Sequence, residues 1–356
     1  MKGNLPVHGP KISVVLIAYD RPSMVEHALK TLTGQTYQDL EIVVVLNGAT
    51  PEVRTTVAEF QTRSNNVSEV NFPVNIYNLD DFSLQIRTVY RAGFESTTGE
   101  FVFFQSDDDY VAQDFFSRMA RLFIENGRCH SAIGLPCSHY WSDDRILPAE
   151  EGAWSKRSTY MPGTTVALRS LDSRTYPGFM PNPGFSYVMS RDGILKAEDF
   201  WGGFEMTQLT QVVAFGESGF DPLAAMYWGR GTHQGNVMVD TLPIRRSAAL
   251  KRMYVSENQK ERAVAYAMWQ AAFSRAESGE LSRLMKAREE EQTVQVFVRS
   301  LSAGHVSDAW KAVRLVGIPS MSFVSMLSLQ MLRSIARLLT PRSVRERIRA
   351  SSRGTS

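Results

Sequence analysis

Cysteine is scarce in this sequence, which holds two cysteines among 356 residues. Cys129 and Cys137 have seven residues between them and form no CxxC pair, so they provide no zinc-binding framework. A single disulfide between them stays open, although two cysteines in a chain of this length indicate free, buried thiols.

Long apolar runs are also missing. The sequence contains no run of roughly 18 or more apolar residues, which is the length that a membrane-spanning helix needs. Its first ten residues lack the basic start and the apolar segment of a signal peptide. We therefore expect a cytoplasmic protein without a transmembrane helix.

Charge of one sign does not dominate the chain. Its 39 Lys and Arg residues nearly balance its 37 Asp and Glu residues, which gives a formal net charge of +2. The whole molecule is therefore not built to bind a polyanion, and we expect no nucleic-acid partner. Hydrophobic residues make up 43% of the chain and charged residues 21%, as in globular proteins that bury a core.

Apolar segments and helical patterns alternate through the first hundred residues, which predicts βαβ units around a mostly parallel sheet. Nearly continuous apolar runs indicate strands that are buried on both faces. The expected strands are 12–18, 41–46, 74–77 and 100–105, and the expected helices are 22–34, 51–63 and 82–95.

Polar residues follow three of these strands. Tyr19 and Asp20 follow the first strand, and Asn47 closes the second. The acidic triplet 107–109 follows the strand that ends at Gln105. Ligands of open α/β sheets bind beyond the carboxyl ends of the strands, so we expect these residues to meet at one edge.

The acidic triplet indicates a divalent metal, Mg²⁺ or Mn²⁺. Clustered carboxylates repel each other unless a cation lies between them, and these ions take oxygen ligands while they bridge two phosphates. A solvated acidic turn or a helix N-cap is the alternative interpretation, because Asp is favoured at both places.

Three segments, in order, carry a family resemblance. Residues 12–22 (ISVVLIAYDRP) and 32–45 (LTGQTYQDLEIVVV) are followed by residues 98–108 (TGEFVFFQSDD). They are similar to the first strand, the first-helix-to-second-strand junction and the metal motif of inverting glycosyltransferase family 2. The likeness covers about residues 11–125. It implies the GT-A fold, an α/β Rossmann-like mixed sheet flanked by helices.

The resemblance also implies a nucleotide-sugar site at the turn formed by Ala18, Tyr19 and Asp20. There the Tyr19 ring would stack on the nucleobase. Asn47 stands where the family often has an aspartate that reads the base edge, and Leu46 departs from the usual aspartate.

The metal motif carries over in the same way. Asp107 would contact the ribose or the metal, Asp108 would be the principal metal ligand, and Asp109 would be a further metal ligand. Gln105 stands where many family members have the first aspartate of the motif. Either Arg87 or Arg91 would reach the base or the diphosphate, with an ordinary exposed helix charge as the alternative.

An inverting transfer needs a base that takes the proton of the acceptor hydroxyl. Family members supply an Asp or Glu downstream of the metal motif, and we favour Glu205, which follows Gly202 and Gly203. The alternative is a carboxylate that the helix dipole favours in a first turn. His233, in a Gly-rich segment, would complete the metal shell, although a lone histidine is often structural.

The rest of the chain divides into two parts. From residue 134 to 236 it is rich in Gly, Pro and aromatics, and we expect the less regular half of one catalytic domain over residues 10–240. A helical C-terminal extension is expected over residues 241–356. Residues 331–356 hold seven arginines and one acidic residue after a Met- and Leu-rich run, as in helices on anionic membranes. We expect peripheral attachment to the inner face of the membrane, with a core helix and a disordered basic tail as the alternative.

These features predict a glycosyltransferase that moves one sugar from a nucleotide-diphosphate donor to the hydroxyl of a glycan or lipid-linked glycan acceptor. The enzyme would be of the hexosyl- or deoxyhexosyl-transferase type, in bacterial surface-polysaccharide or other glycan assembly. The chain lacks the QxxRW motif of processive synthases, so a non-processive enzyme is expected.

Two alternatives stay open. A sugar-nucleotide nucleotidyltransferase has a related sheet but opens with a Gly-rich phosphate loop, and residues 18–22 (AYDRP) form no such loop. A non-catalytic module would use the acidic turn only to bind a cation or a carbohydrate.

Overall fold

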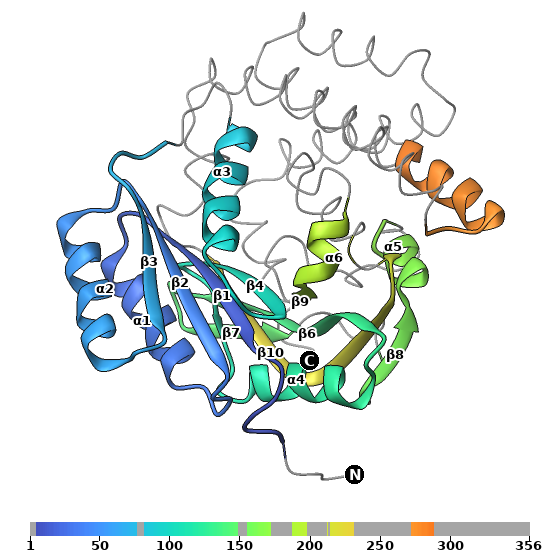
Figure 1. Ribbon diagram of the computed structural model, residues 1–356, viewed down its shortest axis with the longest axis horizontal. Coiled ribbons are helices and arrows are strands. Elements are labelled where there is room, and N and C mark those ends of the chain that lie inside the picture. The colour runs from blue at the N-terminus through green and yellow to red at the C-terminus, as the bar shows by residue number, and fades with distance from the viewer. Residues whose placement is uncertain are drawn as a thin grey trace, which may run out of the picture.

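The centre of the protein is a ten-stranded mixed sheet, seen in the computed structural model of Figure 1. The structure describes residues 5–76, 82–148, 155–171, 187–197, 212, 214–230 and 272–287. The strands are β1 (Ile12–Ala18), β2 (Leu40–Asn47), β3 (Val67–Phe72), β4 (Phe101–Ser106), β5 (Tyr110–Val111), β6 (Cys129–Tyr140), β7 (Arg145–Pro148), β8 (Thr159–Pro162), β9 (Tyr187–Ser190) and β10 (Glu217–Arg230). The helices are α1 (Pro22–Thr33), α2 (Pro51–Arg63), α3 (Phe82–Glu95), α4 (Phe115–Glu125), α5 (Gly163–Leu171), α6 (Arg191–Lys196) and the segment 275–287.

The first half of the sheet is parallel, as the sequence predicts. The strands lie in the order β3-β2-β1-β4-β9-β6-β10-β5, with β7 on β6 and β8 on β10. β1 pairs in parallel with both β2 and β4. Val14 and Leu16 pack in one core with α1, α2 and α4, whereas Val15 and Ile17 pack in the other with α3. Both faces of β1 are therefore buried, which explains its continuous apolar run.

Local signals in the sequence set the helix ends. Pro22 opens α1 and Pro51 opens α2, because the fixed φ of proline suits the first helical position. The hydroxyl of Thr50 accepts a hydrogen bond from the backbone N–H of Val53 and caps α2. These two helices, α3, β1, β2 and β4 lie within one residue of their predicted bounds, so these predictions are confirmed.

The third predicted strand was placed wrongly. The sequence indicated residues 74–77, whereas β3 covers Val67–Phe72 and pairs in parallel with β2. β3 lies at the end of the sheet and exposes Ser68 and Glu69, so it lacks the apolar run that marks the central strands. Pro73 follows it, and a proline cannot donate to a strand ladder.

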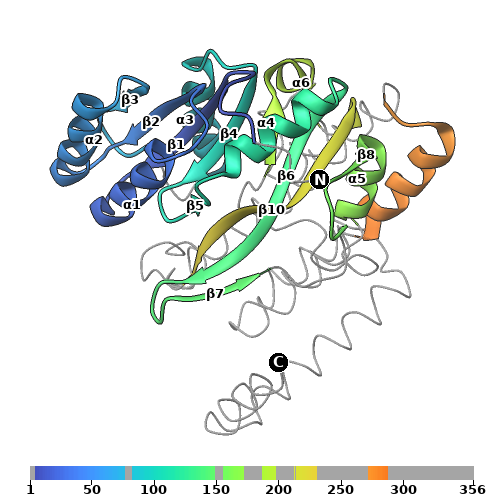
Figure 2. The ribbon, with the colours of Figure 1, turned by 90° about the horizontal axis from the view of Figure 1, so that it is seen from below.

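The second half of the sheet is more regular than the sequence indicated. β6 and β10 hold 12 and 14 residues and run side by side, with β7 along β6 (Figure 2). The register of β10 shifts between Asp221 and Ala225, and Pro222 lies in this irregularity. A bulge accommodates a proline inside a strand, so the Gly- and Pro-rich composition concealed two long strands.

Part of the predicted C-terminal extension belongs to the core. Phe273, Leu281 and Leu284 are buried in the cluster that also contains Val166 of α5. The Thr164 hydroxyl donates to a carboxylate oxygen of Glu277 at 2.8 Å. The domain boundary at residue 240 and the basic tail lie outside the described residues, so the predicted division stays a prediction.

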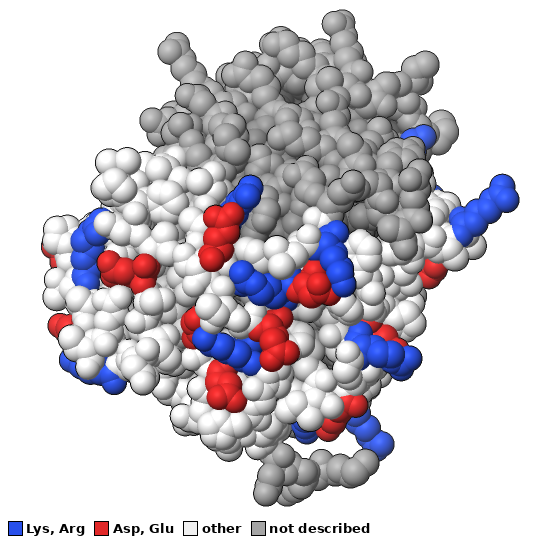
Figure 3. Space-filling view, viewed as in Figure 1, with Lys and Arg blue, Asp and Glu red and all other residues white. Residues whose placement is uncertain are grey.

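The two cysteines, Cys129 and Cys137, are free and buried, as expected. Within the described ranges, no helix has the length and apolar character to cross a membrane. On the face shown in Figure 3, Lys and Arg side chains lie among Asp and Glu, and the described part of this face shows no patch of one sign. Some opposite charges pair one helical turn apart, as in Lys30–Glu26 and Arg63–Glu59.

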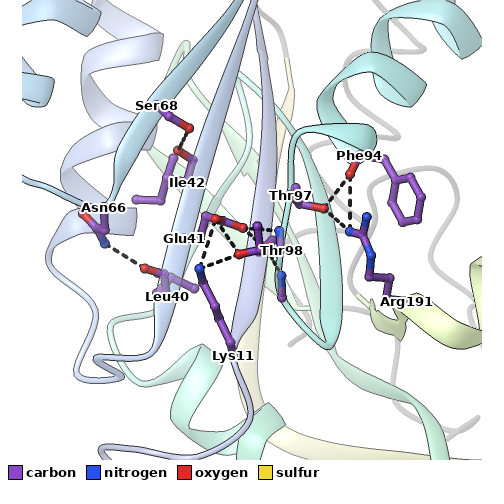
Figure 4. A network of polar contacts seen from close by, with 12 residues as sticks. Lys11, Leu40, Glu41, Ile42, Asn66, Ser68, Phe94, Thr97, Thr98 and Arg191 are labelled. Atoms are coloured by element: carbon purple, nitrogen blue, oxygen red, sulfur yellow. Dashed lines mark hydrogen bonds and ion pairs between the residues drawn. The ribbon is translucent and has the colours of Figure 1, made fainter.

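Glu41 joins three chain segments at the edge of the sheet where β1, β2 and β4 begin (Figure 4). Its carboxylate accepts hydrogen bonds from the Ser13 hydroxyl, from the Lys11 ammonium at 3.1 Å and from the Thr98 backbone N–H at 2.7 Å. Burial raises the pKa of Glu41, but these hydrogen bonds outweigh burial and hold the pKa below its ordinary value of 4.5. Glu41 and Thr98 both lie in the segments that carry the family resemblance, and their contacts therefore hold the starts of the strands together.

We expect Glu41→Gln to lower the free energy of unfolding by about 1–3 kcal/mol at neutral pH, because donors to a buried carboxylate lose their charged acceptor. Urea unfolding measures this loss, and Glu69→Gln, exposed on β3, is the matched control. The folded-state pKa lies below the unfolded one, so the contribution is present above pH 4.5 and is lost as the pH falls through the folded-state pKa. This role would be contradicted if the difference in unfolding free energy between wild type and Glu41→Gln did not decrease in acid.

Candidate functional site

The carboxyl ends of β1, β2 and β4 meet at one edge of the sheet, which confirms their predicted convergence. Ala18 at the end of β1 pairs with Leu46, and Ile17 pairs with Ser106 at the end of β4. The segments that follow therefore lie beside one another, and they carry the polar residues singled out in the sequence. A crevice beyond the strand ends is where open α/β sheets bind ligands.

Arg21 joins the turn after β1 to the acidic turn after β4. Its Nε donates to Asp107 Oδ2 at 3.2 Å, and its Nη2 donates to Asp107 Oδ1. Its Nη1 donates to Asp108 Oδ2 at 2.9 Å. The guanidinium thus forms a two-nitrogen fork on one carboxylate and a single bond to the next.

Burial and neighbouring charges shift the pKa values of Asp107 and Arg21 in this ion-pair cluster. Burial raises the pKa of Asp107 to about 6, although the Arg21 charge pulls it down. Burial also lowers the pKa of Arg21, but the charges of Asp107 and Asp108 more than offset burial and raise it overall. The Arg21 side chain is 16% exposed, so water screens the three charges only in part.

Asp109 bonds to β10 and is almost fully buried. Its Oδ1 accepts the backbone N–H of Gly229 on β10 at 2.9 Å, and the residue is 3% exposed. Burial, followed by the charge of Asp108, raises the pKa of Asp109 well above its ordinary value. Gln105 is fully buried and its amide donates to the Asp109 carbonyl at 2.9 Å. Asp109 therefore ties the acidic turn to β10.

Aromatic side chains surround the back of the acidic turn. The indole N–H of Trp141 donates to the Asp108 carbonyl at 3.3 Å, and the Trp141 ring lies 4.4 Å from the His139 ring. Tyr110 stacks on Tyr227 at 4.6 Å and shares a hydrogen bond of 3.1 Å with His139. His27 of α1 meets the Tyr110 ring edge-on at 4.6 Å. The turn is thus supported from α1, β6 and β10.

The predicted base-binding residues differ in exposure. Tyr19 is 39% exposed at the end of β1, so its ring is available for stacking. Asn47 is fully buried, and its amide donates to Asn75 while its Oδ1 accepts the Ile76 backbone N–H, both at 3.0 Å. Gly48 follows with φ +64°, a conformation that glycine adopts without steric cost. The Asn47 side chain therefore holds the segment after β3 beside this edge.

Several predicted residues cannot be placed with these. Glu205 and His233 lie outside the described residues, and so does the side chain of Arg87 on α3. Arg91 pairs with Glu95 one turn further along the same helix, at 2.8 Å, and the Arg91 side chain is 58% exposed. The roles of Glu205, His233 and Arg87 stay predictions.

Arg21, Trp141 and Gly229 were not among the predicted site residues. Arg21 stands in the segment that carries the family resemblance, and its place there is the signal that could have predicted it. Trp141 and Gly229 lie 33 and 120 residues away from their partners in the acidic turn. No local pattern connects residues so far apart.

At Gly229, β10 approaches the acidic turn closely. A Cβ at this position would lie 2.2 Å from the Asp108 carbonyl oxygen and 2.8 Å from Trp141 Nε1. We expect Gly229→Ala to lower the free energy of unfolding by about 1–3 kcal/mol through overpacking, as measured by urea unfolding. Gly127→Ala is the matched control, because nothing lies within 4 Å of its Cβ position. Equal stability of the two variants would contradict the close approach.

Comparisons with known proteins show a similarity to glycosyltransferases. Residues 13–164 match the family described as Glycosyl transferase family 2. An uncharacterized glycosyltransferase of Nostoc sp. is 28% identical over 179 residues, which cover 50% of each chain. Glycosyltransferase GlyA of Streptococcus pneumoniae is 25% identical over 115 residues, 32% of this chain and 15% of that protein. The chain thus matches half or less of the length of these relatives.

A solved structure supports the same assignment at the level of fold. The crystal structure of residues 1–349 of S. aureus TarS, in complex with UDP-GlcNAc, has a TM-score of 0.50 at 13% identity. The match covers 85% of this chain and 90% of that one. The described sheet and its flanking helices form the GT-A fold, and residues 13–164 match glycosyl transferase family 2.

Proposed function

We propose that this chain transfers a single sugar from a nucleotide-diphosphate sugar to an acceptor hydroxyl, with inversion and with the help of a divalent metal. The observation that carries the proposal is the pair Asp107 and Asp108 at the edge where β1, β2 and β4 end. This edge is where open α/β sheets bind nucleotides. The family match of residues 13–164 supports the reaction class.

The donor would lie across the ends of β1 and β2. The exposed Tyr19 ring would stack on the nucleobase, beside Ala18 and Asp20. Asn47 has both ends of its amide bonded within the protein, so we propose that it positions the neighbouring segment against the base. The nucleotide sugar in the TarS structure supports this class of donor, and the base and the sugar stay open.

Asp107 and Asp108 would hold the metal. Their oxygens are ligands of the kind that Mg²⁺ and Mn²⁺ take. Among the residues that the structure describes, no three His, Cys, Asp or Glu side chains form a group that could hold a metal ion. Two carboxylates suit an ion whose remaining ligands are phosphate oxygens of the substrate. When bound, the ion would screen the negative charge of the leaving diphosphate.

The remaining steps fall to residues outside the described part of the chain. In an inverting transfer, the acceptor oxygen bonds to the anomeric carbon as the bond to the diphosphate oxygen breaks. Glu205 would take the proton of the acceptor hydroxyl. His233 would add to the metal shell and Arg87 would contact the diphosphate. Asp109 accepts a hydrogen bond from the backbone N–H of Gly229, so we propose that it supports the turn rather than binds the metal.

The acceptor and the location of the enzyme rest on the sequence alone. A glycan or a lipid-linked glycan in bacterial surface-polysaccharide assembly is the proposed acceptor. The basic tail at residues 331–356 would bring the enzyme to the anionic inner face of the membrane.

A nucleotide-binding panel tests the donor and the metal together. We expect thermal stabilisation by one nucleoside diphosphate or its sugar, stronger with Mn²⁺ than without it. Asp108→Asn should weaken this metal-dependent binding by about tenfold or more, because it removes a charged metal ligand. Asp192→Asn, exposed on α6, is the matched control. Absence of metal-dependent nucleotide binding in the wild type would remove the proposed function.

Turnover by a variant tests the base. We expect Glu205→Gln to abolish transfer to the acceptor, because an amide cannot take the hydroxyl proton, while donor affinity stays unchanged. Transfer is measured by release of the nucleoside diphosphate and donor affinity by calorimetry. Retained turnover in Glu205→Gln would reject the assignment.

A further inference from the structure

Arg21 places all three nitrogens of its guanidinium on the acidic turn. Two of them face the two oxygens of Asp107, and the third lies 2.9 Å from Asp108 Oδ2. These are oxygens that the proposed metal would use. A guanidinium on these oxygens takes up their lone pairs and repels a second cation, so Arg21 and a divalent ion compete for this turn.

We propose that Arg21 is the counter-cation of the acidic turn in the donor-free protein, and that a divalent ion displaces it only together with a nucleoside diphosphate. This inference deepens the proposed function and rests on it. It makes Arg21 a positioning residue that sets the order of binding: metal and nucleotide arrive as one complex, and metal alone binds weakly.

The contacts explain why a metal alone would bind weakly. It would have to break three charge-assisted hydrogen bonds of Arg21, and each of these is stronger than a neutral one. Among the described residues it would gain two carboxylates in return, because Asp109 accepts the N–H of Gly229 and no further acidic or histidine ligand there joins the group. Removing the guanidinium would also leave it without partners in a partly buried site.

A nucleoside diphosphate changes this balance. Its phosphate oxygens would complete the coordination of the ion, and they would offer the released guanidinium new acceptors. The backbone of Arg21 is held in place, because its carbonyl accepts the N–H groups of Met24 and Val25 at 3.1 and 3.0 Å and Pro22 follows it. Only the side chain has to move, so its positive charge stays at the same edge of the sheet.

Mn²⁺ binding to the purified full chain tests the inference without any turnover. The free Mn²⁺ signal in electron paramagnetic resonance gives the affinity for wild type, Arg21→Met and Arg21→Lys, each with and without UDP or GDP. Methionine keeps the length of the side chain and removes its charge. Arg63→Met, which removes an exposed charge on α2, is the matched control.

We expect Arg21→Met to bind Mn²⁺ alone at least about tenfold more tightly than wild type does, because the ion no longer competes with charge-assisted hydrogen bonds. Arg21→Lys should bind it more tightly than wild type by a smaller factor, because an ammonium cannot form the two-nitrogen fork. The nucleotide should raise Mn²⁺ affinity most in wild type, and Arg63→Met should behave as wild type.

Two results would overturn the inference. One is tight binding of Mn²⁺ alone to wild type, at the affinity found with nucleotide. The other is an Arg21→Met or Arg21→Lys protein that binds Mn²⁺ alone no better than wild type; the lysine variant decides if the methionine variant does not fold. Failure of the proposed function gives a different result, in which no protein binds a nucleoside diphosphate with or without Mn²⁺. The comparison with Mn²⁺ alone still decides the role of Arg21.

Discussion

The rest of the structure depends on the parallel pairing of β1 between β2 and β4. Parallel strands end at the same edge, so this pairing brings the turns after Ala18, Asn47 and Ser106 together, although they are far apart in the chain. It also brings the starts of the three strands together at the opposite edge, where Glu41 and Thr98 hold them. A polar network stabilises the edge where the strands start, and the edge where they end carries the charged groups of the site.

Charge at the site edge is arranged so that three adjacent carboxylates can coexist. Asp107 and Asp108 share the guanidinium of Arg21, whereas Asp109 turns to the backbone N–H of Gly229. Each carboxylate thus has a donor, as partly buried charges require. The donors come from the turn after β1 and from β10, which lie on either side of β4, so the acidic turn depends on both halves of the sheet. This dependence makes its geometry a property of the whole domain.

The sequence predicted the first half of the fold well because its signals are local. Pro22 and Pro51 mark helix starts, and the runs 12–18 and 41–46 are apolar on both faces because both faces are buried. The prediction was wrong where tertiary context overrides composition. β3 is a half-exposed strand at the end of the sheet and lacks an apolar run. β10 accommodates Pro222 at a register shift that no local sequence pattern predicts.

The sequence by itself determined the chemistry available at the site: which acids follow β4, which aromatic follows β1, and which family residues 13–164 match. Only the tertiary structure decided how those groups are used. Hydrogen bonds from Arg21 and Gly229 assign different tasks to three identical side chains, and Trp141 supports the turn from 33 residues away. The physical reason is that the energy of a buried charge depends on the donors that the fold brings to it, and sequence neighbours do not supply them.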